Sequence, residues 1–410
     1  MRRTTPILVL LVAVLTALNI APVRAQSTVW ASQNGLLAFR TDRDADREVF
    51  TMSATGQNPT NLTDNAGISD AQPAWSPDGG RVAYVRRRPE TARPDLFVMT
   101  AAGTGRTRLT KTPALERDPS WSPDGTRIVY ASRTTPGAPL RIFVANADGS
   151  EPDQLTTQGK GDADRSPAWS PDGTRIAFVS DRDGGFPELY VMNADGGGIR
   201  RVTMNSFIDG NPTWSPDGLT VAVERCCPTG SSEIVAIDVA TRSEVSLTAT
   251  TSQMESDPSW SPDGTTIAFA SFTVGEGNVD IWTMSADGSS PVRLTTDAAV
   301  DLAPDWQPLP TCTVVGTDQS DPDIQGTDAN DVICADAGDD VVMAGLGHDL
   351  VFGGKGADII DGDFGSDVLV GDAGDDTIDG GPDFDYLDGG TGIDACDGGA
   401  DGGVTRRCES

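Results

Sequence analysis

Apolar and polar residues follow two different rhythms along this chain. Over roughly the first three quarters, short apolar segments such as RIAFVS (175–180) and ELYVM (188–192) recur with turn residues between them, which is typical of half-buried β-strands. In the last quarter, a single apolar residue recurs every nine residues among glycines and aspartates. The pattern predicts an all-β protein made of two different repeat architectures in tandem.

The first repeat is marked by the pentapeptide WSPDG. It begins at Trp75, Trp121, Trp169, Trp214 and Trp260, and a sixth tryptophan, Trp306, continues as WQPLP. The spacings are 46, 48, 45, 46 and 46 residues, a length that suits one four-stranded propeller blade. Ser-Pro-Asp-Gly predicts a hairpin turn, because proline presets φ and glycine accepts left-handed geometry.

The two ends of this region are incomplete in complementary ways. The first end has strands LLAFR, EVFTM and PTNLT without a preceding tryptophan strand, whereas the last end has the Trp306 strand and nothing after it. One blade therefore takes one strand from the last end and three from the first. The expected result is a closed ring of six blades, which removes exposed sheet edges.

These repeats resemble the TolB-type β-propeller, and the resemblance covers about Trp30 to Pro308. It implies a fold more than a function, because such propellers bind proteins, flank hydrolases or stand alone. We predict a six-bladed β-propeller over residues 26–306, a proline-containing linker over 307–311, and a separate domain over 312–410.

The second repeat is a nonapeptide with aspartate in phase. Eight aspartates fall nine residues apart, at Asp331, Asp340, Asp349, Asp358, Asp367, Asp376, Asp385 and Asp394. An apolar residue or cysteine follows each by two places, and glycine usually precedes each by two, with Ala329 and Asp383 as exceptions. A tight loop that alternates with a short strand explains this mixture, because glycine permits positive φ and one inward side chain fills the core.

The charge of this region requires a cation. Residues 312–410 contain 24 acidic and 3 basic residues, a net charge of −21, and too little apolar surface to fold alone. Carboxylates and backbone carbonyls are hard oxygen ligands, which suit calcium. A glycine-rich acidic linker is the alternative interpretation, although a linker needs no phase.

The stretch from Gly326 to Asp397 resembles the RTX, or haemolysin-type, calcium-binding repeat, Gly-Gly-x-Gly-x-Asp-x-apolar-x. The resemblance implies a parallel β-roll with calcium held between loops two repeats apart. It makes the eight aspartates the side-chain ligands of about six ions. The first two repeats, GTDANDVIC and ADAGDDVVM, depart from the glycine pattern, which leaves their site open.

The beginning of the chain is typical of a secretory signal over residues 1–25. Arg2 and Arg3 precede the apolar run from Ile7 to Leu18, and Val23 and Ala25 suit a cleavage site. This run is too short to span a bilayer, and no other segment could. The sequence therefore predicts a secreted, extracellular protein, or one in the periplasm or on the cell surface.

Six cysteines in a secreted chain suggest disulfides. In a regular roll, Cys334 and Cys396 would lie roughly 16 Å apart along the stack, beyond the about 7 Å that a disulfide allows between Cα atoms. We expect the local pairs Cys312–Cys334 and Cys396–Cys408 at the two ends of the roll. Cys226 and its neighbour Cys227 could form a vicinal pair or remain thiols.

Enzymatic chemistry finds little support in the composition. The one histidine, His348, occupies a variable repeat position, so Ser-His-Asp and Cys-His catalysis have no base. The net charge of −31 argues against nucleic acid and anionic membranes as partners. A glycosidase that uses a pair of carboxylates stays open as an alternative.

One acidic set in the propeller could carry function. An acid lies five residues before each tryptophan, at Asp70, Glu116, Asp164, Asp209, Glu255 and Asp301. We expect these acids in loops near the mouth of the channel. They could form a repeat-encoded hydrogen bond to the loop backbone, or an acidic ligand rim that binds a cation or a basic ligand.

The sequence as a whole predicts a secreted, non-enzymatic calcium-binding protein. The propeller would be a recognition platform for an unknown protein or cell-envelope ligand, and the roll would fold on calcium. The alternative is an extracellular carbohydrate-active enzyme that uses propeller carboxylates.

Overall fold

The computed structural model describes residues 34–408 with several gaps, and residues 409–410 lie outside it. The gaps are positions 45, 318, 330, 384 and 407 and segments 88–92, 158–162, 227–230, 249–252, 274–276, 309–311 and 400–402. The predicted signal at 1–25 and Cys227 lie outside the described residues. Among the residues it describes, none forms a helix long and apolar enough to cross a membrane.

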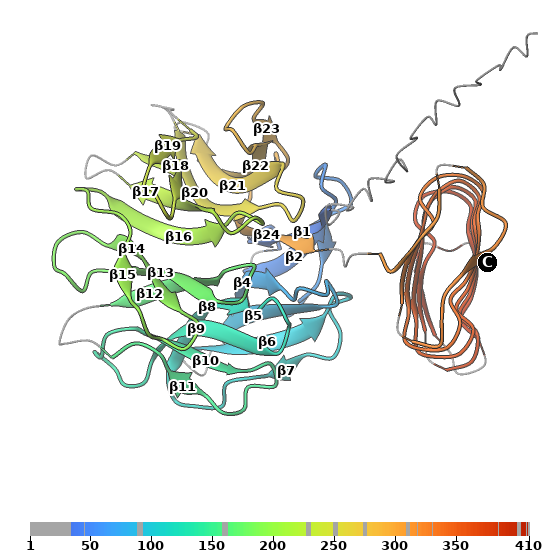
Figure 1. The fold of residues 1–410 in the computed structure, drawn as a ribbon, viewed down its shortest axis with the longest axis horizontal. Helices are drawn as coiled ribbons and strands as arrows, with labels where there is room; N and C mark the ends of the chain where they lie inside the picture. The colour runs from blue at the N-terminus through green and yellow to red at the C-terminus, as the bar shows by residue number, and fades with distance from the viewer. Residues whose placement is uncertain are drawn as a thin grey trace, which may run out of the picture. The chain divides into compact units, whose positions relative to one another are not determined.

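The first domain contains six antiparallel sheets of four strands each over the described residues, arranged as the blades of a propeller (Figure 1). The first blade is β4 (Ser69–Trp75), β5 (Arg81–Arg87), β6 (Pro94–Thr100) and β7 (Thr107–Arg108). The second is β8 (Leu115–Trp121), β9 (Arg127–Arg133), β10 (Arg141–Asn146) and β11 (Asp153–Gln154). The third is β12 (Asp164–Trp169), β13 (Arg175–Ser180), β14 (Glu188–Asn193) and β15 (Arg200–Arg201).

The fourth blade is β16 (Ile208–Trp214), β17 (Thr220–Cys226), β18 (Ser232–Asp238) and β19 (Glu244–Ser246). The fifth is β20 (Gln253–Trp260), β21 (Thr266–Thr273), β22 (Val279–Ser285) and β23 (Val292–Arg293). The sixth blade joins the two ends of the domain in the order β24 (Leu302–Pro308), β1 (Asn34–Thr41), β2 (Glu48–Met52) and β3 (Thr60–Asn61). The predicted closure, with one strand from the last end and three from the first, is confirmed.

The WSPDG motif joins neighbouring blades. The guanidinium of Arg81 in the first blade lies 4.7 Å from the ring centroid of Trp121 in the second, and Arg127 stacks in the same way on Trp169 at 4.8 Å. The turn glycine Gly125 has a φ of 65°, and a Cβ there would lie 3.5 Å from Pro77 of the preceding blade. The motif therefore supplies a cation–π contact and a close turn at each such interface.

The second domain is a parallel β-roll of two sheets, drawn in orange to red in Figure 1. One sheet contains β25 (Val314–Val315), β27 (Val332–Cys334), β29 (Leu350–Lys355), β31 (Val368–Ala373), β33 (Tyr386–Asp388) and β35 (Val404–Arg406). The other contains β26 (Ile324–Gln325), β28 (Val341–Met343), β30 (Ile359–Asp361), β32 (Thr377–Asp379) and β34 (Ala395–Asp397). Neighbouring strands pair residues that are 18 positions apart, as Val351 pairs with Leu369, except that β25 pairs with β27 at an offset of 19, as Val314 with Ile333.

The core of the roll is one column of apolar side chains from each sheet. Its members include Ile333, Val342, Val351, Ile360, Leu369, Ile378 and Leu387, each exposed by 1% or less. They are the residues two places after the phased aspartates. Such a thin core buries few side chains per turn, so the loops must contribute to the stability of the roll.

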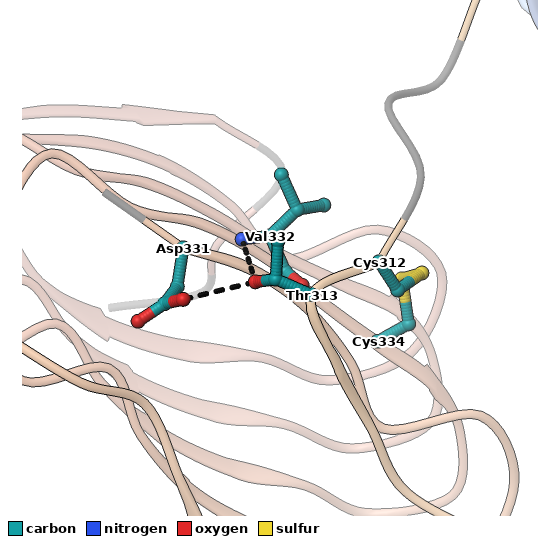
Figure 2. Close-up of a disulfide and its surroundings, with 5 residues drawn as sticks. All are labelled: Cys312, Thr313, Asp331, Val332 and Cys334. Atoms are coloured by element: carbon teal, nitrogen blue, oxygen red, sulfur yellow. Dashed lines mark hydrogen bonds between the residues drawn. A yellow bond between two sulfur atoms is a disulfide. The ribbon is translucent and has the colours of Figure 1, made fainter. Parts of the chain in front are cut away.

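Both predicted disulfides are confirmed. Cys312 pairs with Cys334 and Cys396 pairs with Cys408, each with Cα atoms 5.8 Å apart. Figure 2 shows the first of these bridges beside Thr313, Asp331 and Val332. The bridges tie the chain beyond the first and last nonapeptides to the strands of the roll.

Candidate metal centre and propeller cavity

The phased aspartates connect successive turns of the roll. The backbone N–H of Asp340 donates to Oδ1 of Asp358 at 2.9 Å, and that of Asp358 donates to Oδ1 of Asp376 at 2.9 Å. On the other side, Asp349 donates in the same way to Asp367 at 2.8 Å. In each accepting aspartate, Oδ1 is therefore hydrogen-bonded to the backbone of the loop two repeats before it.

The second carboxylate oxygen of the phased aspartates, Oδ2, accepts no hydrogen bond in most of them. Oδ2 is buried and has no hydrogen-bond partner in Asp340, Asp349, Asp358, Asp367, Asp376 and Asp385. Burying such an atom unpaired costs free energy. Six buried carboxylate oxygens without a hydrogen-bond donor fit a cation as their partner.

Backbone carbonyls face the same spaces. A Cβ at Gly353 would lie 2.6 Å from Oδ2 of Asp358, and one at Gly356 would collide with the carbonyl oxygen of Gly338. The glycines therefore let the carbonyls of one loop approach the next loop closely. Carboxylate and carbonyl oxygens together form the donor set that calcium prefers.

Burial disfavours the ionised form of these aspartates in the absence of a cation. It raises the pKa of Asp367 and of Asp376 to about 6. Burial also raises the pKa of Asp340, Asp349, Asp358 and Asp385 above the ordinary value. A divalent cation between the loops would reverse this effect, because it favours the ionised form.

The two end members of the series, Asp331 and Asp394, differ from each other in their contacts. Oδ1 of Asp394 accepts from the N–H of Asp376 at 3.0 Å, as in the middle of the ladder. Asp331 instead accepts from two threonine hydroxyls, those of Thr313 at Oδ1 and Thr327 at Oδ2 (Figure 2 shows the Thr313 contact). The hydrogen bond from Thr327 contributes most, and together with that from Thr313 it holds the pKa of Asp331 below its ordinary value.

The six acids before the tryptophans do not form an exposed rim. Asp70, Glu116, Asp164, Asp209, Glu255 and Asp301 are each exposed by 1% or less. Five of them lie within the innermost strands, and Asp301 directly precedes β24. The expectation of loop residues at the mouth of a channel is corrected by this burial.

Arginines and hydroxyls surround these acids. Arg86 binds Asp70, Arg182 binds Asp164 and Arg225 binds Asp209, at 2.7, 2.6 and 2.8 Å. Arg43 binds Asp301 at 3.2 Å. The hydroxyl of Thr112 donates to Glu116 at 2.7 Å and that of Thr248 to Glu255 at 3.4 Å.

A threonine of the Leu-Thr or Val-Thr pairs also contacts the acid in several blades, as Thr110, Thr203 and Thr248 contact Glu116, Asp209 and Glu255, whereas Thr63 donates to Glu48 instead. Thr203 Oγ1 accepts from the backbone of Leu189 at 2.9 Å and donates to Asp209 at 2.6 Å. The hydroxyl contact of Asp209 is therefore with a side chain, and not with the loop backbone that was one of the two alternatives from the sequence. This contact joins the outermost segment of a blade to the next innermost strand.

The axis of the propeller contains a cavity of about 330 Å³. Several residues of each blade line it, and in every blade they include the residue three positions before the tryptophan and directly before a proline: Gln72, Asp118, Ser166, Asn211, Asp257 and Ala303. All six have a positive φ, between 44° and 54°. The register between the two innermost strands shifts at this point in every blade, so the bulge is a property of the repeat.

Hydrogen bonds run around this ring from blade to blade. The N–H of Ser166 donates to Asp118 at 3.1 Å, and the hydroxyl of Ser166 donates to Asn211 at 3.1 Å. Nδ2 of Asn211 then donates to Asp257 at 2.6 Å. The ring is a polar surface already ordered within the fold.

The ring is not symmetric in charge. The position that pairs with the fourth residue before each tryptophan is Val85, Ala131, Val179 or Ala270 in four blades, but Glu224 and Arg40 in the other two. Burial, and then the neighbouring Asp257 carboxylate, raise the pKa of Glu224 to about 7. Burial also raises the pKa of Asp305, which lines the cavity, to about 7.

Comparison with known families agrees with both repeat patterns. The model of the TolB β-propeller domain matches residues 71–165 and 135–275. The chain belongs to the TolB β-propeller domain family. The RTX calcium-binding nonapeptide repeat (4 copies) matches residues 323–351, 335–369, 361–396 and 370–403, so the roll is built of RTX repeats.

Relatives of the propeller are TolB proteins. A Tol-Pal system protein TolB of Anaeromyxobacter dehalogenans is 60% identical over 37 residues, which are 9% of this chain and only 8% of that protein. The crystal structure of TolB from Acinetobacter baumannii is 26% identical with a TM-score of 0.58, covering 67% of each chain. A putative TolB from Agrobacterium tumefaciens is 19% identical with a TM-score of 0.51, covering 68% of this chain and 99% of that one.

The RTX loops fit calcium by their donor chemistry. Within the described part of the chain, no three His, Cys, Asp or Glu side chains converge on one point. A site between two RTX loops would therefore combine few carboxylates with several backbone carbonyls. Calcium accepts 6 to 8 oxygen ligands in flexible geometry, which suits such a mixed set.

Two groups of residues escaped the sequence prediction. Asp321 donates its N–H to Oδ1 of Asp340 at 2.6 Å and so extends the ladder by one loop. The shared pattern GTDQSD and GTDAND, starting at Gly316 and Gly326, could have revealed it. The cavity ring could have been found as the residue directly before the proline that recurs two positions ahead of each tryptophan, such as Asn211 before Pro212.

Proposed function

We propose that this protein is a secreted, non-enzymatic calcium-binding protein whose RTX roll folds on calcium and whose TolB-type propeller is a recognition platform. The observation that carries the proposal is the row of buried, unpartnered Oδ2 atoms from Asp340 to Asp385. Several calcium ions between the loops would pair these atoms and offset much of the −21 charge of residues 312–410. Metal binding would then supply folding free energy.

The two disulfides support the secretion part of the proposal, because they fit an oxidising compartment outside the cytoplasm. Two disulfides close the ends of the roll, and such bridges persist in secreted and periplasmic proteins. Millimolar calcium is available outside the cell, and extracellular modules bind it at about 10⁻⁴ to 10⁻³ M. The roll would then fold only after the chain has reached a compartment with enough calcium.

A calcium titration of the full chain tests the folding step. All eight tryptophans precede residue 312, so tryptophan fluorescence reports on the propeller alone, whereas circular dichroism reports on both domains. We expect β signal to rise with calcium while the fluorescence stays constant. Full β signal in chelator, with no change on adding calcium, would refute calcium-dependent folding.

The propeller offers its axial cavity as the recognition point for a protein or cell-envelope ligand. The ring of positive-φ residues is held by blade-to-blade hydrogen bonds, so a partner would meet a preorganised surface. A pull-down from native cell-envelope extract, with wild type and Asn211→Ala in parallel, tests this. We expect the wild type to retain one partner and the variant to retain less of it. Equal retention would show that the binding surface does not include the cavity ring.

An enzymatic role has little support from the propeller acids. The six acids before the tryptophans are buried in ion pairs and hydroxyl contacts, so a carbohydrate-active enzyme would have to use other propeller carboxylates. Turnover of an extracellular polysaccharide by the purified protein would overturn the non-enzymatic assignment.

A further inference from the structure

The loops of the roll form two columns, and the first loop of each column has a different sequence from the rest. One column begins with loop 326–331 and continues two repeats later with 344–349; the N–H of Asp331 donates to Asp349 at 2.7 Å. The other begins with loop 316–321 and continues with 335–340. Both first loops read Gly-Thr-Asp-x-x-Asp, with threonine at the second position.

Thr327 donates hydrogen bonds to the carboxylate oxygen of Asp331 that a cation would otherwise bind. Oδ2 of Asp331 accepts from both the N–H and the hydroxyl of Thr327, each at 2.7 Å. Oδ1 accepts from the hydroxyl of Thr313 at 2.9 Å, next to the Cys312–Cys334 bridge (Figure 2). Neither oxygen of Asp331 is left over, in contrast to Oδ2 of Asp349 two repeats later.

The other first loop repeats this arrangement. Oδ2 of Asp321 accepts from the N–H of Thr317 at 2.6 Å and from its hydroxyl at 3.0 Å. The two loops lie in different columns and share no residue. The same solution at the start of both columns indicates a common role.

The backbone of the first loops also differs from that of the later ones. The second loop position has a positive φ at Asp336, Gly345, Gly354, Asp363, Asp372, Gly381 and Gly390, and the fourth at Gly338, Gly347, Gly356, Gly365, Gly374, Asp383 and Gly392. Thr327 and Ala329, which fill these positions in the first loop, are described and have no positive φ. A β-branched residue avoids the left-handed region, so Thr327 prevents the conformation that brings the carbonyls toward the next loop.

We propose that Thr317 and Thr327 close the first loop of each column without calcium, so that Asp321 and Asp331 are structural acceptors and calcium loading begins at the second loop. The threonine donors replace the cation at the end of the stack, where no preceding loop completes a coordination shell. The pairs of loops that take calcium fall from about six to about five. This inference rests on the proposed calcium binding of the RTX roll.

Calcium stoichiometry of the full chain tests the assignment. Equilibrium dialysis would compare wild type with Asp331→Asn and Asp367→Asn, with circular dichroism at saturating calcium to show that each variant is folded. We expect Asp331→Asn to keep the wild-type number of ions and Asp367→Asn to lose at least one. A loss of an ion in folded Asp331→Asn would overturn the proposal.

A converted loop provides the converse test. Thr327→Gly combined with Ala329→Gly restores the glycine pattern of the later loops and leaves Asp331 without its threonine donor. We expect this variant to bind one ion more than the wild type, and an unchanged number in the folded variant would contradict the proposal. If the variant does not fold, the comparison of Asp331→Asn with Asp367→Asn decides alone.

The two proposals fail in different ways. Wild-type protein that binds no calcium would refute the proposed function of the roll. Wild-type protein that binds calcium, with equal losses in Asp331→Asn and Asp367→Asn, would refute only the closure by threonine.

Discussion

Arg86 on β5 and Asp70 on β4 form a bidentate ion pair inside the first blade. Nε donates to Oδ1 at 2.8 Å and Nη2 to Oδ2 at 2.7 Å. Asp70 is fully buried and Arg86 is 9% exposed, and the guanidinium also stacks on Tyr84 and Phe97. The pair fixes the orientation of both strands at a point where a lone charge would be costly.

We predict that Asp70→Asn destabilises the propeller strongly. The substitution leaves Arg86 buried without its charge partner, which costs about 3 to 5 kcal/mol when one member of a buried pair is removed. The melting temperature, followed by tryptophan fluorescence, should fall by roughly 10 °C. Asp153→Asn, at an exposed position of β11, is the matched control, and an equal melting temperature in both variants would show that the pair contributes nothing.

Glu224 should limit stability at alkaline pH. Its pKa in the folded protein, about 7, lies above that of an exposed glutamate, so the stabilising protonated state is lost as pH rises through 7. Glu224→Gln keeps the shape and removes the titration. We expect the variant to melt several degrees above wild type at pH 8.5, and this difference to shrink as pH falls towards about 4, near the pKa of an unfolded glutamate. Exposed Glu151→Gln should show no such trend.

Acid should partly replace calcium in the roll. Asp367 and Asp376 have folded pKa values of about 6, above the roughly 3.9 of an unfolded aspartate. Their contribution to the calcium-free fold is therefore present below about pH 4 and lost as pH rises through 6. In chelator, far-ultraviolet circular dichroism of the full chain should show more β signal at pH 4.5 than at pH 7.5, with tryptophan fluorescence as the record of the propeller.

The double variant Asp367→Asn, Asp376→Asn sharpens this experiment. Neutral amides mimic the protonated carboxyls, so the calcium-free roll should hold more β structure at pH 7.5 than wild type while binding fewer ions. If acid and amides leave the calcium-free signal unchanged, charge burial does not oppose folding of the roll.

The bridge between Cys396 and Cys408 should lower the calcium concentration needed for folding. It closes a sequence separation of 12 residues, and a loop of that size constrains the unfolded chain by about 3 kcal/mol. Cys396→Ala with Cys408→Ala should shift the midpoint of the calcium titration to higher concentration. An unchanged midpoint would mean that the last turn folds independently of the calcium loops.

Much of the architecture was readable from local patterns. The tryptophan spacing, the complementary ends around LLAFR and Trp306, and the nine-residue phase of the aspartates each specify a contact between neighbouring repeats. Repeat proteins are quasi-one-dimensional, so such contacts recur with the period and determine the fold. The disulfide pairs followed from the same regular rise per turn.

What the sequence alone determined is therefore the repeats, the closure of the ring and the supply of oxygen donors in the roll. Only the tertiary structure decided which oxygens are already used: Asp70 is satisfied by Arg86, and Asp331 by Thr313 and Thr327, whereas Asp349 keeps Oδ2 without a partner. The reason is physical. A period specifies where an acid recurs, but its burial and hydrogen-bond partners depend on strand register, bulges and φ at single positions, which vary between repeats of the same period.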